Sequence, residues 1–449
     1  MYRDPTYRPQ AFMAKVFALF ALGEVYSSRA KDSSDGNIPG LSYFKYASSL
    51  VQVLPERADL DHVETLLLLS FYSHNLNRRH SAYSWIGSAL RLSISLGLHH
   101  NLPPTVALQP LMHQHRIRLW WTIYTCDRMW GSKLGHPPTI QDTDISVDLP
   151  SSSDLDESEI RQLSDPGYII ANVQLARIVS EIISTIYRRK DPPPLIQSVQ
   201  KILRDLKTWI ANLPENATLS TSGGPLPRYI ISLHLSFNQC VILATRPVLL
   251  HVLEISRPSI PTDPLGRTSQ IPAHVNTIAE ACIHAARHSN ELLTEAYTEG
   301  TLATFGYFDA QYIFSSAVVL EIASILNSQN IDSTLMQSSA HQLQFMAESG
   351  NLAAIEFCGH LDAVKLACEE YRSRVAVATD TSITVNANEA NQESSAVGMQ
   401  FDTFTTERAL AQGSMRDFLN EDVFPFDLPD VTSLVDGTSS FFYDLPMEL

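Results

Sequence analysis

The spacing of the apolar residues is the feature of this sequence that most constrains its fold. Through most of residues 1–378, apolar residues recur at intervals of three and four, and alternating runs bounded by turn residues are almost absent. Such intervals place side chains on one face of a helix, whereas a half-buried strand requires a period of two. We therefore predict an all-α fold of about twelve helices, covering residues 9–30, 41–54, 60–77, 79–96, 110–131, 165–189, 195–212, 226–253, 271–298, 301–327, 333–347 and 351–376.

The last part of the chain differs from the rest in composition. The whole sequence has a formal charge of −16, and residues 381–449 hold twelve acidic side chains against two basic ones. A segment with few apolar residues and a high net charge cannot bury enough surface to fold. We therefore expect two parts, an all-α body over residues 1–378 and a disordered acidic tail over residues 379–449.

Composition also argues against several classes of protein. The net negative body lacks the clustered Lys and Arg that a broad phosphate-binding surface needs. The five cysteines are far apart, unlike those of a disulfide framework or of a paired-cysteine zinc site. The N-terminus lacks a signal-peptide pattern, and no window approaches the roughly 18 apolar residues of a membrane span. We therefore expect an intracellular protein that does not enter a membrane.

The most informative motif is HRIRLWWTIYTCDRMWGSKLGHPPTIQDTDISVDLP, at residues 115–150. On a helix, one face would carry Ile117, Trp120, Trp121 and Tyr124, and the neighbouring face would carry Leu119, Ile123, Cys126 and Trp130. An apolar surface this wide predicts a central helix that is buried on most sides.

A charged pair and a chain reversal follow this apolar stretch. Asp127 and Arg128 would lie at the end of a mostly buried helix, where an unpaired charge is costly, so each needs a partner. For Asp127 we expect hydrogen bonds from the turn that follows, or from Arg91, Arg116 or Arg118. Gly135 and Pro137 turn the chain, and the segment TIQDTDISVDLP would then cross the helix ends as a strap.

A second glycine marks the end of the preceding helix. In SLGLHHNLPP, Gly97 can adopt the left-handed conformation that closes a last helical turn, and Leu98 can pack back over that turn.

A catalytic or metal site is the alternative interpretation of the motif. The candidate groups are Asp127 with His136 or His115, the pair His99 and His100, and the pair His113 and His115. Residues two apart point in different directions on a helix, and the G-x-S-x-G, H-E-x-x-H and P-loop motifs are absent. We therefore assign no catalytic, metal or cofactor-binding residue, and we expect a protein that is not an enzyme.

Two ordered blocks of this sequence resemble a known family. SAYSWIGSALRLSISLGLHH and the block that begins at Arg116 are similar to the regulatory domain of fungal zinc-cluster transcription factors, also called the middle homology or xylanolytic-activator-type domain. The resemblance covers about residues 10–255. Its matching residues are Ala89, Leu96, Gly97, Leu98, His99, Arg116, Arg118, Trp120, Trp121, Tyr124, Asp127, Arg128, Gly135, Pro137, Ile140, Asp144 and Pro150.

The resemblance implies a transcription regulator with an all-α regulatory domain, located in the nucleus or shuttling between nucleus and cytoplasm. It also implies DNA binding, zinc binding, a small-molecule effector, and association with itself or with a related factor. The six closely spaced cysteines of the family's zinc cluster are absent from these residues, so DNA would be reached through a missing or partner-supplied domain. The alternatives are a stand-alone interaction regulator or dominant inhibitor without DNA binding, and an α-helical enzyme with a pocket between helices.

The acidic tail has the composition of an activation segment. Residues 401–449 carry ten acidic side chains against two basic ones, with interspersed aromatic residues that include Phe418, Phe424, Phe426, Phe441, Phe442 and Tyr443. Acidic neighbours keep such aromatics accessible, so the segment can fold onto a coactivator or the transcription machinery when it binds. A solubilising tail and a segment that docks on its own body are the alternatives.

Overall fold

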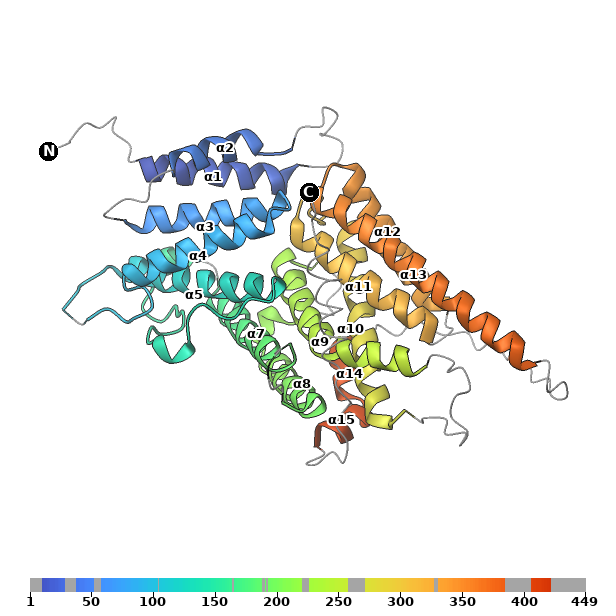
Figure 1. The fold of residues 1–449 in the computed structure, drawn as a ribbon. Helices are drawn as coiled ribbons and strands as arrows, with labels where there is room; N and C mark the ends of the chain where they lie inside the picture. The colour runs from blue at the N-terminus through green and yellow to red at the C-terminus, as the bar shows by residue number, and fades with distance from the viewer. Residues whose placement is uncertain are drawn as a thin grey trace.

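In the computed structural model, helices are the only regular secondary structure over the residues that it describes (Figure 1). These are residues 10–383 and 405–420, apart from gaps at 29–37, 52–57, 104, 164, 188–189, 191–192, 220–225, 257–270 and 327–329. No strand occurs within these ranges, so the predicted fold class is confirmed.

Each of the twelve expected helices has a counterpart in the structure. The counterparts are α1 (Gln10–Ser27), α2 (Leu41–Leu50), α3 (Leu60–Asn75), α4 (Arg79–Ser95), α5 (Pro110–Lys133), α7 (Pro166–Thr185), α8 (Leu195–Ala211), α9 (Arg228–Ile255), α10 (Ala273–Thr298), α11 (Tyr307–Leu326), α12 (Asn330–Glu348) and α13 (Leu352–Ile383). Three short helices were not expected, namely α6 (Glu157–Ile160), α14 (Thr406–Ala411) and α15 (Gly413–Asn420). The apolar period therefore located the long helices and missed the short ones.

One helix begins later than the apolar pattern predicted. Helix α11 was expected from residue 301 but starts at Tyr307. The preceding backbone makes other hydrogen bonds: the Asp309 carboxylate accepts from the backbone N–H of Ala303 at 2.8 Å, and the Asn75 side chain accepts from that of Tyr307 at 3.1 Å. These side chains satisfy backbone donors that an additional helical turn would otherwise have used.

Two glycines close the helices of the motif region in the same way. Gly97 has φ of 68° and follows α4, and Gly135 has φ of 65° and follows α5. In each case the next residue reaches back five positions: the Leu98 N–H donates to the Ser93 carbonyl, and the His136 N–H donates to the Gly131 carbonyl. This is the left-handed glycine cap predicted for Gly97, and it aims the following loop back along the helix.

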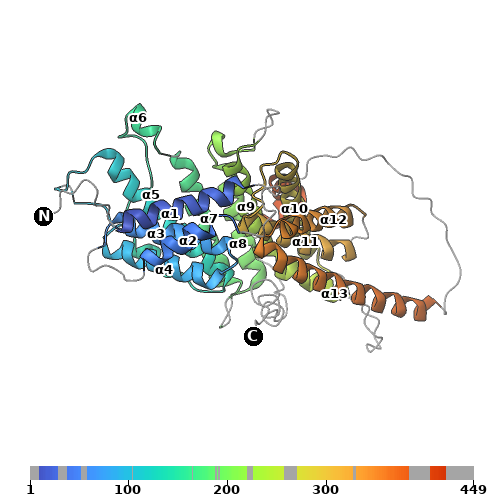
Figure 2. The same cartoon turned by 90° about the horizontal axis from the view of Figure 1, so that it is seen from above.

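Three groups of buried apolar side chains hold the helices together. Helices α1 to α3 share the first, α5 is at the centre of the second with α3, α4 and α7 around it, and the third and largest extends from α7 to α13. In Figure 1, α1 to α5 therefore lie on one side, α10 to α13 on the other, and α7 to α9 between them. Helix α13 runs past the ends of its neighbours (Figure 2).

Two helices are long and apolar enough to cross a membrane, contrary to the expectation that no window approaches this limit. They are α9 and α11, and 89% and 78% of their most apolar windows are buried inside the protein. Both contribute to the largest core, where a helix is surrounded by other helices and needs no polar face. Their hydropathy is explained by this central position.

Part of the expected disordered tail is folded onto the body. Helices α14 and α15 place four buried apolar side chains, Leu410, Met415, Phe418 and Leu419, into the largest core. The remaining tail aromatics of the prediction, Phe424, Phe426, Phe441, Phe442 and Tyr443, lie outside the described residues. Docking on the body, one of the alternatives for the tail, is therefore what residues 405–420 do.

We predict that Gly97→Ala destabilises the body. A Cβ at this left-handed position costs about 1–2 kcal/mol, and we expect the free energy of unfolding in urea to fall by that amount. The matched control is Gly87→Ala in the interior of α4, where a Cβ meets no atom within 4 Å. That change should raise stability by about 0.5–1 kcal/mol. Equal stability of Gly97→Ala and the unaltered chain would contradict the cap.

Candidate functional site

The tryptophans of the motif are packed inside the body. Trp120 is completely buried, and Trp121 and Tyr124 are nearly so. The Trp121 indole N–H donates to the carbonyl of Asp148 at 2.8 Å, in the segment that follows the helix. Helix α5 therefore has the central, mostly buried position that its wide apolar surface predicted, and the strap is fastened to it.

Arg128 connects three segments of the chain. Its guanidinium donates to the Ser180 hydroxyl on α7 at 2.7 Å, to the Ile140 carbonyl at 3.0 Å and to the Asp142 carboxylate at 2.5 Å. The Tyr124 hydroxyl donates to the same carboxylate at 2.7 Å, and the guanidinium lies over the Tyr124 ring. Because a guanidinium offers several donors in a fixed fork, one side chain can fix α5, the strap and α7 relative to one another.

Asp127 is bonded to the turn that follows the helix, the first of the two places where a partner was expected. The Thr139 hydroxyl donates to the Asp127 carboxylate at 3.0 Å. Burial raises the pKa of Asp127, and the hydrogen bonds from Thr139 and the positive charges of Arg128 and Arg91 offset part of this rise. The Asp127 carboxylate thus bonds the loop to the helix. Asp127 and Pro137 line the same small pocket.

The two arginines at the start of the motif bind backbone carbonyls. Arg116 donates to the Leu96 carbonyl at 3.3 Å, which fixes the end of α4, and Arg118 donates to the Ser151 carbonyl at 3.5 Å. The Gln114 side chain, which sequence reasoning missed, accepts from the Ser151 N–H at 2.9 Å. The sequence pattern that could have identified Gln114 is a polar residue on the buried side of an otherwise apolar helix. The contacts of Arg118 and Gln114 therefore hold the C-terminal end of the strap.

Three of the histidines considered as catalytic or metal-binding groups, His100, His115 and His136, make other contacts. The His136 ring packs on Tyr83, with 4.9 Å between ring centroids, and His100 bonds to the Ser146 hydroxyl at 2.8 Å. His115 pairs with Glu64 at 2.6 Å. In the part of the chain that the structure describes, no group of three or more His, Cys, Asp or Glu side chains could hold a metal ion.

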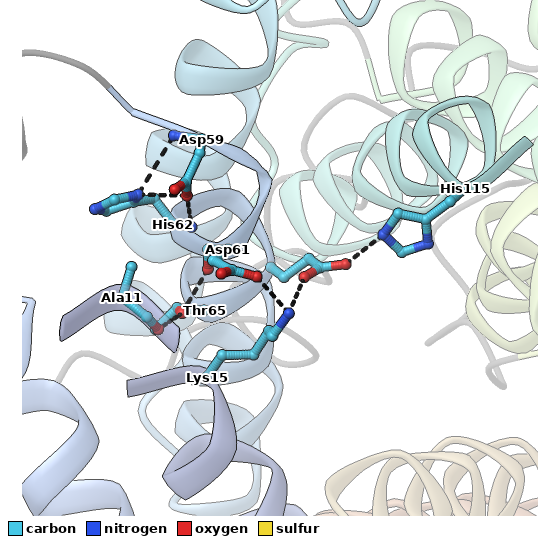
Figure 3. Close-up of polar contacts among 8 residues, drawn as sticks. Ala11, Lys15, Asp59, Asp61, His62, Thr65 and His115 are labelled. Atoms are coloured by element: carbon cyan, nitrogen blue, oxygen red, sulfur yellow. Dashed lines mark hydrogen bonds and ion pairs between the residues drawn. The ribbon is translucent and has the colours of Figure 1, made fainter. Parts of the chain in front are cut away.

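Glu64 is the centre of a polar cluster that the sequence did not reveal. One of its oxygens contacts His115 on α5, and the other accepts from the Lys15 ammonium on α1 at 2.8 Å (Figure 3). Lys15 also donates to Asp61 at 2.5 Å. Burial would raise the pKa of Glu64, but the hydrogen bonds from His115 and Lys15 lower it below its usual value. The cluster joins α1, α3 and α5, which are far apart in the sequence.

A second candidate site is the place where the tail helices meet the body. Thr406, fully buried, donates its hydroxyl to the Asn238 side chain on α9 at 2.7 Å, and its backbone N–H donates to His288 Nδ1 on α10 at 3.2 Å. Burial, with the nearby His234, lowers the pKa of His288 to about 3, so the ring is neutral and can accept this bond. We call Thr405–Asn420, with these contacts, the tail latch.

The far end of the tail latch is held by α8. Gln200 donates to the Phe418 carbonyl at 2.7 Å, and Arg204 donates to the Leu419 carbonyl. The Phe418 ring itself is 2% exposed. Phe418 was assigned to the activation segment, and in this structure it serves as an anchor in the core and is not presented to a partner.

We predict that Arg128→Met loosens the α5 strap. The change removes three charge-assisted hydrogen bonds at a buried position, and we expect the free energy of unfolding to fall by about 2–4 kcal/mol. Arg177→Met is the control, because Arg177 reaches the same Asp142 carboxylate at 3.6 Å from an exposed position, where a pair contributes less than about 1 kcal/mol. Similar losses for the two variants in urea denaturation would show that Arg128 is not the fastening residue.

We predict that Phe418→Ala releases the tail latch without unfolding the body. Truncating a buried Phe costs about 3–5 kcal/mol. This cost exceeds the free energy that holds a short segment docked on the body. Hydrogen exchange measured by mass spectrometry should show faster exchange of residues 405–420, by about tenfold or more, with α5 and α9 unchanged. Asp417→Ala, at an exposed neighbouring position, should leave the exchange as it was. Unchanged protection in Phe418→Ala would contradict the anchoring role.

Transcription regulators of several fungi are similar to between 64% and 79% of this chain. An uncharacterized transcriptional regulatory protein of Schizosaccharomyces pombe is 28% identical over 362 residues, which are 79% of this chain and 44% of that protein. Activator of stress genes 1 of Saccharomyces cerevisiae is 28% identical over 65% of this chain and 32% of its own. An ABC-transporter-regulating transcription factor of Aspergillus oryzae is 26% identical over 64% and 33%, respectively. The chain thus spans less than half the length of these relatives.

The family model that matches this chain covers the α5 motif. No solved structure matches the chain. Residues 1–211, from the N-terminus to the end of α8, match the fungal specific transcription factor domain, and the α5 motif with its strap lies within them. Residues 1–211 of this chain are therefore similar to the fungal specific transcription factor domain.

Proposed function

We propose that this chain is the regulatory and activating part of a fungal transcription regulator. The family of residues 1–211 and the names of the relatives, which are transcriptional regulators and activators, support this role and do not suggest an enzyme. The observation that carries the proposal is the tail latch. It ends at Asn420, where the acidic and aromatic residues 421–449 begin.

In the proposed mechanism, the body controls the accessibility of the tail. The tail latch holds the base of the acidic segment against α8, α9 and α10 through Thr406 and Phe418. A signal that favours the undocked state would release this base, and the aromatic residues of the tail would then bind coactivators or the transcription machinery. Such a switch needs a ligand or partner with different affinities for the two states.

The proposal includes location and assembly. We place the protein in the nucleus, with possible exchange with the cytoplasm, because transcription regulators act there. DNA and zinc binding would reside in a zinc cluster of a longer protein or of a partner, since the described residues show no metal-binding group. Self-association or pairing with a related regulator would bring the tail to DNA.

A reporter assay tests the activating role. Residues 381–449 and residues 1–449 are each fused to a heterologous DNA-binding domain. We expect the tail fusion to activate the reporter and the longer fusion to be weaker, because the tail latch restrains the tail. Phe418→Ala in the longer fusion should raise its activity several-fold, whereas Asp417→Ala should not.

The controls separate activation from release. Phe424→Ala together with Phe426→Ala should lower the activity of the tail fusion, since accessible aromatics make the coactivator contacts. If the tail fusion is expressed at the same level and activates no more than the DNA-binding domain alone, the activating role is wrong. Binding to a related regulator would then favour the stand-alone inhibitor.

A further inference from the structure

A cavity lies where the α5 region meets the central and C-terminal helices. It is lined by side chains from α4, α5, α9, α11 and α13, is partly open to solvent, and leaves about 20 Å³ for the centre of a water-sized molecule. Its polar lining consists of Arg79, Lys133, Gln239, Arg246, Gln311 and Ser315, together with Tyr307. Three of these side chains are cations, and no carboxylate is among the described lining residues.

Lys133, at the last turn of α5, is one of these cations. Its ammonium donates to the side-chain amide oxygen of Gln311 and lies over the rings of Tyr307 and Phe308, at 5.3 and 4.4 Å from their centroids. Among the residues that the structure places, no carboxylate pairs with it. Arg79 differs in this respect, because it forms an ion pair with Glu356 at the edge of the cavity.

Enclosure of this charge is costly. Burial, with the positive charge of Arg79, lowers the pKa of Lys133 to about 7. A lysine that served only to pack α5 against α11 would be replaced without loss by an apolar residue of similar length, since buried charges stabilise a fold poorly unless they are paired. The surroundings of Lys133 therefore suit a ligand whose negative charge pairs with the ammonium.

A hydroxyl group and a second guanidinium also line this cavity. The Ser315 hydroxyl is buried, with the residue 4% exposed, and it has no hydrogen-bond partner among the described residues. Ser315 lies one turn from Gln311 on α11, so both line the cavity from the same side. The buried guanidinium of Arg246 lines the cavity from α9 and donates to the Tyr187 hydroxyl at 2.8 Å.

We propose that this cavity binds a small anion through carboxylate or phosphate oxygens. The anion would pair with the Lys133 ammonium and accept hydrogen bonds from the Ser315 hydroxyl and a glutamine amide. Charge-assisted bonds to an enclosed anion are stronger than those between neutral groups, and the apolar rings beside Lys133 exclude competing water. The pocket is small, so the ligand is a small acid or the acidic end of a larger one.

The position of the cavity suggests what binding would do. The anion would connect α5 of the fungal specific transcription factor domain to α9, α11 and α13. Its use as the signal of the transcription regulator rests on the proposed function, but the binding itself does not. Binding and regulation are therefore tested separately.

The binding test uses the purified chain with two probes, inorganic phosphate and acetate, and acetamide as the neutral isostere of acetate. We expect the melting temperature to rise with at least one anion at constant ionic strength, and not with acetamide. Isothermal titration calorimetry then gives the affinity. Stabilisation by phosphate alone assigns the ligand to the phosphate class, and stabilisation by acetate alone assigns it to the carboxylates.

Variants locate the site. Lys133→Met should abolish anion stabilisation while the protein stays folded, because the half-buried Lys133 has no ion-pair partner among the described residues whose charge the change would leave unpaired. Ser315→Ala should weaken binding at least about tenfold, the effect of losing one hydrogen bond to a charged group. Lys45→Met, on the exposed side of α2, should bind as the unaltered chain does.

Two results would overturn the site. One is the absence of any shift with phosphate or acetate up to concentrations that saturate weak anion sites. The other is a shift that persists unchanged in Lys133→Met. Neither measurement involves transcription, so a failed reporter assay leaves the binding result standing, and a failed binding assay leaves the tail latch standing.

Discussion

The burial of α5 on nearly all sides is the constraint on which the rest of the structure depends. Helices α3, α4 and α7 pack around Trp120 and its neighbours, and the helix cannot end in solvent without exposing that apolar surface. Its polar groups must therefore find partners nearby. The strap supplies them, with Thr139 for Asp127 and with Ile140 and Asp142 for Arg128. The motif thus fixes a scaffold, and Asp127, which the sequence also offered as a catalytic candidate, is one of the residues that fasten the strap.

The family match ends inside a continuous core. Residues 1–211 carry the fungal specific transcription factor domain, yet the largest core extends from α7 to α13. Trp209, near the end of the match, stacks on Phe237 of α9 with 5.2 Å between ring centroids, and its indole bonds to the Ala171 carbonyl. Helices α9 to α13 therefore complete the fold of the matched region. This continuity also places the cationic cavity at a junction, where a ligand can act on both halves.

The tail latch shows how a short segment in an acidic region can hold to a large body. Its four anchors are apolar, and its single buried polar side chain, Thr406, is bonded to Asn238. Docking of this kind is local, because few residues contribute to it, and it can be undone without disturbing the cores. That property is what a regulated segment needs, in contrast to the permanently fastened strap.

The sequence by itself determined the helical class, the position of twelve helices and the glycine cap at Gly97, because each depends on the period of apolar residues or on the conformation of one residue. It also predicted that Asp127 would bond either to the following turn or to an arginine, and the structure shows the local contact with Thr139 of the turn. Only the tertiary structure decided which distant side chains meet: Glu64 with His115, Arg128 with Ser180, and Lys133 with the α11 side of a cavity. The same holds for the tail latch. Four apolar residues among acids become anchors only when α8, α9 and α10 form the surface that covers them, and no local pattern encodes that surface.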